Sequence, residues 1–119
     1  MPTFETEKDH VGPGWQKLVE LVHNSLTEYL GEDYQVLQIK EKFGGLRYYY
    51  TQPGEVADNQ RQKDYARGCV SLAEAVSFYI CEECGNPGEC RPIGGWYKTL
   101  CDEHRAELER NHGKTVLEQ

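Results

Sequence analysis

The segment that decides the fold begins with Cys81-Glu-Glu-Cys84-Gly and ends with Leu-Cys101-Asp-Glu-His104. Two residues separate Cys81 from Cys84, two separate Cys101 from His104, and sixteen lie between the two pairs. Pairs with this spacing can each reach one zinc ion from a tight turn or a helix start, and structural zinc takes four such ligands in a tetrahedron. Because all four ligands come from the protein, the pattern predicts a structural rather than a catalytic zinc site.

Two alternatives remain open for this segment. Cys90, in the loop between the pairs, could replace His104 as the fourth ligand. The cysteines could instead be reduced residues of a small core, with a histidine on the surface beside them.

The residues between the two pairs predict a β-hairpin. Gly94-Gly95 is a turn signal, and strand-forming residues flank it from Arg91 to Leu100. Asp102 and Glu103 favour a helix start directly after it, and we expect this helix to end near Asn111, before Gly113. The first cysteine pair lies in a tight turn, or zinc knuckle, which is followed by the hairpin and then by the second pair at a helix start. This order resembles the treble-clef zinc fold.

The length of 119 residues fits one domain, with a loose N-terminal segment at 1–12 and a zinc-binding subdomain at 81–112. The N-terminus has no apolar signal core, and no apolar run approaches the length that spans a membrane. Five cysteines, an odd number, favour metal thiolates over disulfides. We therefore expect a cytoplasmic protein without a membrane anchor.

The first eighty residues predict two helices and a hairpin. Helical spacing of apolar residues predicts one helix that starts at 12–14 and ends at Gly31, and another over about 57–80. Alternation predicts strands over 34–42 and 46–51 around Gly44-Gly45, with a strand break at 52–54. The overall prediction is α+β, a small antiparallel sheet of hairpins packed on two helices. The side chains expected to face the core include Leu37, Ile39 and Phe43 of the first strand and Tyr65, Cys69, Leu72, Val76 and Tyr79 of the second helix.

The net charge of −7 argues against a general nucleic-acid binder, so bulk nucleic acid is not an expected partner. Residues 36–51, with three bases and one acid, form the only locally basic block. Arginine binds phosphate through a planar fork, and aromatic rings stack on bases. The candidate ligand-binding residues are Lys40, Lys42, Arg47 and Tyr49 of the first hairpin and Arg91, Trp96 and Lys98 of the second. The competing interpretation is a solvated charged face with aromatic residues that build the core.

Two blocks taken together resemble a known family. They are Gln38-Ile-Lys-Glu-Lys-Phe-Gly-Gly-Leu-Arg47-Tyr-Tyr and the Cys81-Glu-Glu-Cys-Gly segment continued by Gly95-Trp96 and Thr99-Leu-Cys-Asp-Glu-His104. The combination resembles small, mostly uncharacterised zinc-binding proteins of phages, prophages and bacteria, over residues 13–105. The resemblance implies a phage or mobile-element origin and no established activity.

Sequence patterns typical of enzymes are absent. No histidine lies between Cys84 and Cys101, no H-x-E motif precedes the first pair, and no phosphate-binding loop or nucleophile elbow is present. We therefore expect a non-catalytic protein that binds a small anionic, nucleotide-like ligand and sequesters it, for example a host immune signal. The alternative is an interaction adaptor, including an inhibitor of a host protein, and homo-oligomers are possible.

Overall fold

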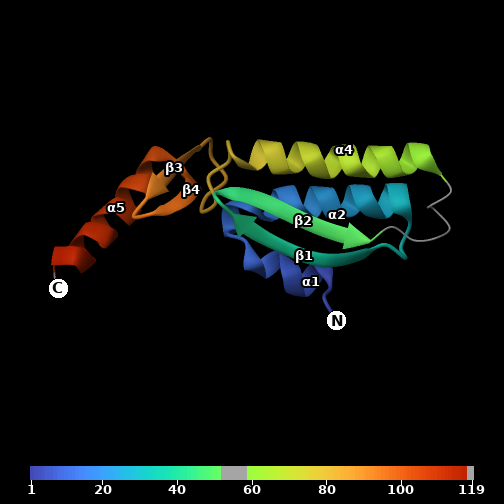
Figure 1. Ribbon diagram of the computed structural model, residues 1–119, viewed down its shortest axis with the longest axis horizontal. Coiled ribbons are helices and arrows are strands. Elements are labelled where there is room, and N and C mark those ends of the chain that lie inside the picture. The colour runs from blue at the N-terminus through green and yellow to red at the C-terminus, as the bar shows by residue number, and fades with distance from the viewer. Residues whose placement is uncertain (52–58, 118–119) are drawn as a thin grey trace.

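The computed structural model describes residues 1–51 and 59–117, which form an elongated α+β molecule of 58 × 27 × 20 Å. Two long helices and a hairpin make the main body, and the segment with the cysteine pairs lies at one end (Figure 1). The predicted α+β class is confirmed. The main body contains α1 (Phe4–Glu7), η1 (Lys8–His10), η2 (Pro13–Trp15), α2 (Gln16–Leu30), β1 (Gln35–Lys42), β2 (Gly45–Thr51) and α4 (Gln60–Ser77). The C-terminal unit contains β3 (Glu89–Ile93), β4 (Trp96–Leu100) and α5 (Asp102–Leu117).

The helix α2 forms where its periodicity predicts. Pro13 lies in the 3₁₀ turn that leads into it, and Gly31, with φ 86°, ends it with a backbone N–H bonded to the Thr27 carbonyl. The buried face recurs every three or four residues, as an amphipathic helix requires. Its members are Trp15, Val19, Val22, Leu26 and Leu30.

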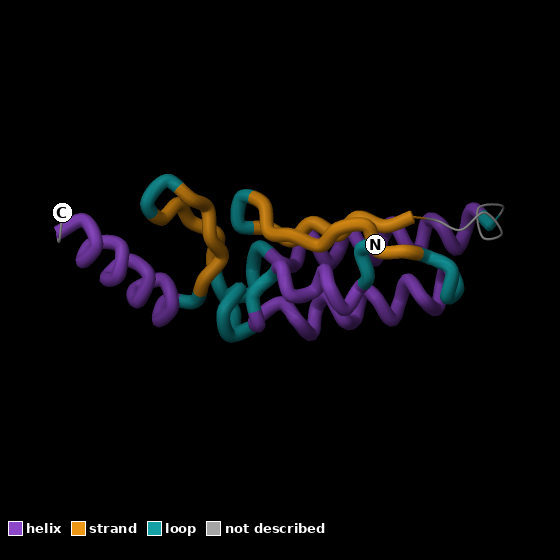
Figure 2. Tube along the Cα trace, turned by 90° about the horizontal axis from the view of Figure 1, so that it is seen from below, coloured by secondary structure: helices purple, strands orange, loops and turns teal. Residues whose placement is uncertain are grey.

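The strands β1 and β2 pair antiparallel, and Figure 2 shows this hairpin running along the two long helices. The register shifts between Val36 and Gln38, and this irregularity interrupts the alternation of the two faces. Val36 and Ile39 are therefore buried, whereas Leu37 is exposed. Phe43 stands in the turn with φ 55° and is also exposed, so the prediction that Leu37 and Phe43 face the core is wrong.

The helix α4 turns a different face inward from the one that periodicity predicts. Its buried residues are the smaller Ala66, Val70, Ala73 and Ser77. The predicted face is instead solvent-exposed at Tyr65, Leu72, Val76 and Tyr79 and half-buried at Cys69. The reason is the packing of α4 against both α2 and β2, which favours small side chains on the buried face.

Side chains of α4 close the outer edge of β2. The Leu46 N–H donates to Ser77 Oγ at 2.8 Å, and the Tyr48 N–H donates to a Glu74 carboxylate oxygen at 2.9 Å. Strand edges carry unpaired backbone groups that need such partners. The helix therefore completes the hydrogen bonding of a strand that has only one neighbouring strand in the described residues.

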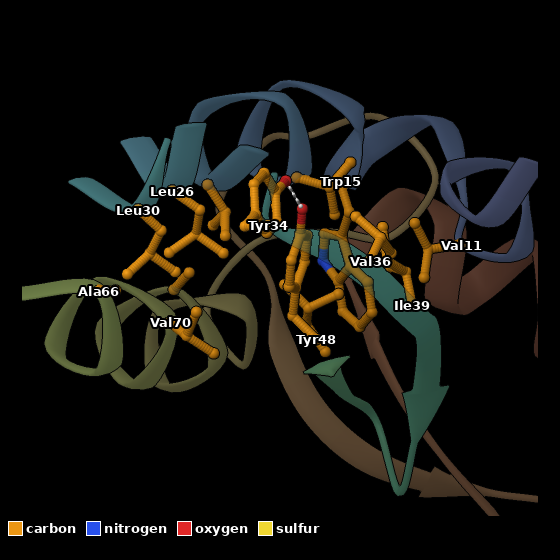
Figure 3. Close-up of a cluster of buried hydrophobic side chains, with 14 residues drawn as sticks. Val11, Trp15, Leu26, Leu30, Tyr34, Val36, Ile39, Tyr48, Ala66 and Val70 are labelled. Atoms are coloured by element: carbon orange, nitrogen blue, oxygen red, sulfur yellow. Dashed lines mark hydrogen bonds between the residues drawn. The ribbon is translucent and has the colours of Figure 1, made fainter. Parts of the chain in front are cut away.

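The core lies between α2, α4 and the inner face of the hairpin (Figure 3). It includes a polar chain in which the Tyr34 and Tyr48 hydroxyls lie 3.1 Å apart and the Tyr34 hydroxyl contacts His23 Nδ1. Burial lowers the pKa of His23 and raises the pKa of both tyrosines, so the neutral imidazole can accept a hydrogen bond from the Tyr34 hydroxyl. His23 stacks on Phe4 and is a packed residue.

Three further expectations need correction. Residues 1–12 are not loose: α1 and η1 pack beside β1, and Glu7 accepts a hydrogen bond from the Ile39 N–H at 3.4 Å. The two hairpins form separate two-stranded sheets rather than one. The last helix continues past Gly113 to Leu117, since one glycine costs a helix only about 1 kcal/mol.

The predicted strand break at 52–54 and helix start near 57 lie outside the described residues.

The contact between Ser77 and the edge of β2 gives a first prediction. Ser77→Ala removes the acceptor of a buried backbone N–H, so the free energy of unfolding should fall by about 1–3 kcal/mol. Ser71→Ala, at an exposed position of the same helix, should leave it within about 0.5 kcal/mol of the parent value. Urea unfolding followed by circular dichroism measures both; equal stabilities for the two variants would contradict the assignment.

Candidate metal centre and basic hairpin face

The four predicted metal ligands lie together. Their ligand atoms are within 4.8 Å of one another. Cys84 Sγ lies 3.8 Å from Cys101 Sγ, and His104 Nδ1 lies 3.6 Å from Cys81 Sγ and 3.2 Å from Cys101 Sγ. A tetrahedral zinc site with bonds of about 2.1–2.3 Å has ligand–ligand edges of about 3.6–3.8 Å. The distances and the donor set of three thiols and one imidazole therefore fit zinc.

Backbone elements fix each half of the site. The knuckle at 81–85 closes with a Gly85 N–H to Cys81 carbonyl bond of 2.9 Å, and Gly85 takes φ 81°, a conformation that favours glycine. At the other half, the first turn of α5 brings His104 over Cys101, whose sulfur accepts the His104 backbone N–H at 3.4 Å. Cys81 is buried and Cys84 exposed, so the site lies at the edge of the unit.

The electrostatics of the site favour a thiolate at Cys81. Burial by itself raises the pKa of Cys81, but backbone hydrogen bonds from Cys101, Cys84 and Glu83 outweigh it and lower the pKa to about 7. At Cys84 the Asn86 backbone lowers the pKa, but desolvation and the side chains of Cys81 and Cys101 together raise it. The sulfurs of Cys101 and Cys81 raise the pKa of His104. Zinc replaces protons on such groups, so a low thiol pKa assists metal binding at neutral pH.

The fifth cysteine of this region does not belong to the cluster. Cys90 Sγ instead lies 3.6 Å from the carbonyl oxygen of Phe43, at the turn of the main hairpin. The alternative in which Cys90 replaces His104 is therefore wrong, because β3 points this side chain at the turn between β1 and β2 rather than at the other cysteines.

The C-terminal unit is joined to the main body at two places. At the first, the Gly14 N–H donates to the Glu82 carbonyl at 2.7 Å and Trp15 Nε1 donates to the Ile80 carbonyl at 2.8 Å. At the second, Thr99 Oγ1 donates to the Gly44 carbonyl at 2.6 Å. The metal site thus lies next to the start of α2, and its hairpin rests on the turn of the other hairpin.

Glu82 contributes to this junction although it binds no metal. Its carboxylate accepts the Thr99 N–H at 2.8 Å, and its own N–H donates to the Thr99 carbonyl at 2.9 Å. Burial raises the pKa of Glu82, and Lys98 lies 3.9 Å from it. Sequence reasoning missed Glu82, because nothing in Cys-Glu-Glu-Cys distinguishes the buried glutamate from the exposed Glu83.

The candidate ligand-binding residues divide into two sets. In the first, Lys40 lies opposite Arg47 in the ladder and Lys42 follows two residues along β1, so the three share the outer face of the hairpin with Tyr49. Lys40 lies 5.8 Å from the Tyr49 ring centroid and Lys42 lies 5.7 Å from that of Phe43. We call Lys40, Lys42, Arg47 and Tyr49 the basic face.

Trp96 lies near one end of this face, whereas Arg91 and Lys98 are neutralised. A hollow of about 330 Å³ separates the two hairpin turns and is lined by Glu41, Lys42, Phe43, Gly95, Trp96 and Tyr97. Arg91 forms an ion pair with Glu89, with Nε 2.8 Å from the carboxylate. Lys98 lies 3.9 Å from both Glu41 and Glu82. The exposed Phe43 is a member of the hollow that sequence reasoning placed in the core.

Comparison of the chain with protein-family models, with curated proteins and with solved structures finds no match. No described helix has the length and apolar character needed to cross a membrane.

The metal centre gives a second prediction. Purified protein should contain one zinc per chain, and Cys84→Ser should lose it and unfold the C-terminal unit, because metal binding and folding of such sites are coupled. Cys90→Ser, the matched control, should keep one zinc because Cys90 lies outside the cluster. Elemental analysis of protein prepared without chelators measures both; a zinc-free parent, or equal zinc loss in both variants, would disprove the ligand set.

Proposed function

We propose that this protein is a non-catalytic binding protein, stabilised by zinc in a treble-clef-like unit, that holds a small anionic, nucleotide-like ligand on the basic face. The observation that carries the proposal is the set of three cations on one face of the hairpin. Within residues 1–51 and 59–111, no acidic side chain forms an ion pair with Lys40, Lys42 or Arg47. Elsewhere in the described residues, Lys8, Arg67, Arg91, Lys98 and Arg105 each lie within 4 Å of a carboxylate, whereas Lys17, Arg61, Lys63 and Arg110 do not. The basic face is distinguished by three such cations side by side on one strand pair.

The spacing of the cations suits a chain of two or three phosphates. Residues two apart on one strand face lie about 6–7 Å apart, and cross-strand neighbours lie about 5 Å apart. Three like charges this close repel one another, and a bound polyphosphate relieves the repulsion. Arginine contributes a two-pronged contact and the lysines contribute point charges.

The aromatic residues near the end of the basic face suit the base of a nucleotide. Trp96 is 75% exposed and Phe43 66% exposed, and both line the hollow that Lys42 also lines. Stacking of a base on an aromatic ring contributes about 1–3 kcal/mol and requires no particular base. A ligand with phosphates on Lys40, Arg47 and Lys42 and its base in the hollow would use both features. In a phage or mobile-element setting, capture of a host immune nucleotide is the concrete form of this activity.

The basic face gives a third prediction. Arg47→Ala should weaken binding of ADP and of pyrophosphate at least tenfold, or roughly 1.4 kcal/mol, because it removes the forked phosphate contact. Trp96→Ala should weaken ADP alone, since pyrophosphate has no base. Isothermal titration calorimetry measures the affinities, and a melting curve for each variant checks the fold.

The control for this experiment is Arg91→Ala, which removes an arginine that already pairs with Glu89 and should leave both affinities unchanged. Equal affinities for parent and Arg47→Ala would show that the basic face is a solvated surface. Absence of binding by the parent, with no nucleotide released when the purified protein is denatured, would refute the ligand class.

The proposal includes a fourth prediction, on catalysis. The four-ligand cluster leaves a tetrahedral zinc no open position, and it is the only grouping of three or more candidate metal ligands in the described residues. ADP, ATP and single-stranded DNA should therefore remain intact during incubation with magnesium, manganese or zinc. Chromatography of the products measures turnover. If hydrolysis of one of these substrates persists through purification and disappears in Arg47→Ala, the basic face is a catalytic site and the non-catalytic proposal is wrong.

A second candidate function is an adaptor for a basic protein. It is favoured by the charge distribution, because the sequence outside 36–51 carries nineteen acids and ten bases. Loss of nucleotide binding combined with capture of a basic host protein would favour this function over the first.

A further inference from the structure

The outer face of α4 carries apolar side chains that the described chain does not cover. Tyr65, Leu72, Val76 and Tyr79 are 50%, 66%, 36% and 71% exposed, and the half-buried Cys69 lies between the first two. The steps between these five residues are four, three, four and three, the spacing of a coiled-coil seam. The first four lie on α4, and Tyr79 lies in the turn directly after the helix ends at Ser77. We call them the α4 seam. The adjacent side of the same helix, about 100° round its axis, already packs on the core through Ala66, Val70, Ala73 and Ser77.

We propose that the α4 seam is a homodimer interface, in which α4 of a second copy of this chain packs antiparallel about a two-fold axis at Leu72. Leu72 is the midpoint between Tyr65 and Tyr79. The two-fold axis therefore sets each Leu72 against itself and each Tyr65 level with Tyr79 of the second copy. Such an isologous contact is self-complementary without any change elsewhere in the molecule.

Gly68 supports close contact with another chain. It lies on the exposed side of α4 beside the seam, and a Cβ atom built on it meets no atom within 4 Å. Nothing in the described chain requires glycine there, although glycine in a helix interior is unfavourable relative to alanine. Ser71 and Ala75, also exposed and small, continue this border and allow a facing helix to approach.

Charge selects the antiparallel direction. The first turns of α4 carry Arg61, Lys63 and Arg67 against Asp64 alone, whereas the chain after its C-terminal end carries the exposed Glu83. The neighbouring Glu82 is buried and bonds Thr99, so it is not available to a second chain. Antiparallel packing places each basic end beside an acidic end and opposes the two helix dipoles, while parallel packing places like charges together. No charged residue is exposed from Gly68 to Tyr79, so nothing with a charge is buried at the centre.

The apolar area that the α4 seam can bury limits the strength of the dimer contact. With about 200 Å² for a large side chain, the four exposed seam residues present about 450 Å² per chain, or about 900 Å² in a dimer. The bordering Gly68, Ser71 and Ala75 bring the contact towards the lower limit of about 1,200 Å² for specific interfaces. A dimer that dissociates in the micromolar range is expected.

Sedimentation velocity of the full-length zinc-loaded protein, from micromolar to submillimolar concentration, tests the proposal. The parent should shift from monomer to dimer, and Leu72→Gln should stay monomeric with an unchanged melting curve. Leu37→Gln, which alters an exposed leucine of β1, should dimerise like the parent. A parent that stays monomeric throughout, or a Leu72→Gln variant that still dimerises, would overturn the proposal.

Two further variants test the geometry. Leu72→Cys in a Cys69→Ser background should form a covalent dimer with a short bismaleimide, because the axis sets the two thiols together; failure to cross-link at concentrations where this variant dimerises would overturn the two-fold axis at Leu72. Gly68→Ala should weaken dimerisation at least tenfold, yet raise the melting temperature of the monomeric Leu72→Gln variant by about 3–6 °C. Unweakened dimerisation of Gly68→Ala would show that no helix packs against Gly68.

Discussion

Gly14 brings the start of α2 into direct backbone contact with the metal-binding knuckle, and the placement of the C-terminal unit depends on this contact. A Cβ atom at Gly14 would lie 2.0 Å from the Cys81 carbonyl oxygen, and one at Gly12 would lie 2.4 Å from that of Glu82. No side chain other than hydrogen fits at such distances. The neighbouring Trp15 is fully buried in the main core while its Nε1–H bonds to the Ile80 carbonyl. One short segment therefore ties the apolar core to the metal centre.

The second constraint is the isolation of the β1–β2 hairpin, which has no third strand in the described part of the chain. Two-stranded hairpins are marginally stable alone. Here helices supply what further strands would: Ser77 and Glu74 of α4 bond one edge, and Glu7 of α1 bonds the other. The inner face is covered by α2 and α4, so the outer face alone remains free for charged residues. The basic face is therefore a consequence of how the hairpin is stabilised, since every other side of it is occupied.

Local patterns predicted those parts of the molecule that local chemistry determines. The spacing of Cys81, Cys84, Cys101 and His104 identified the candidate metal centre, and alternation around Gly44-Gly45 identified the two strands of the first hairpin. The predictions from sequence failed where packing between distant elements decides which side chains are buried. Periodicity in α4 cannot tell a core face from an unpaired apolar face, and the packing against both α2 and β2 selected Ala66, Ala73 and Ser77 over the larger residues. The bulge in β1 likewise left Leu37 exposed. The contact of Gly14 with Cys81 joins residues far apart in the sequence, so the glycine itself was the only local sign of this contact.

The metal centre and the basic face are coupled through one turn. Thr99 bonds the Gly44 carbonyl and Cys90 contacts the Phe43 carbonyl, so the β3–β4 hairpin beside the candidate metal centre holds the β1–β2 turn from outside. Lys42, adjacent to this turn, depends on that support, whereas Lys40 and Arg47 lie further along a ladder that α4 and α1 stabilise. Metal removal should therefore disturb the hollow between the turns and leave the cation pair at Lys40 and Arg47 in place. This asymmetry separates the two parts of the proposed ligand site: the base-binding end requires zinc, and the phosphate-binding end requires the helices.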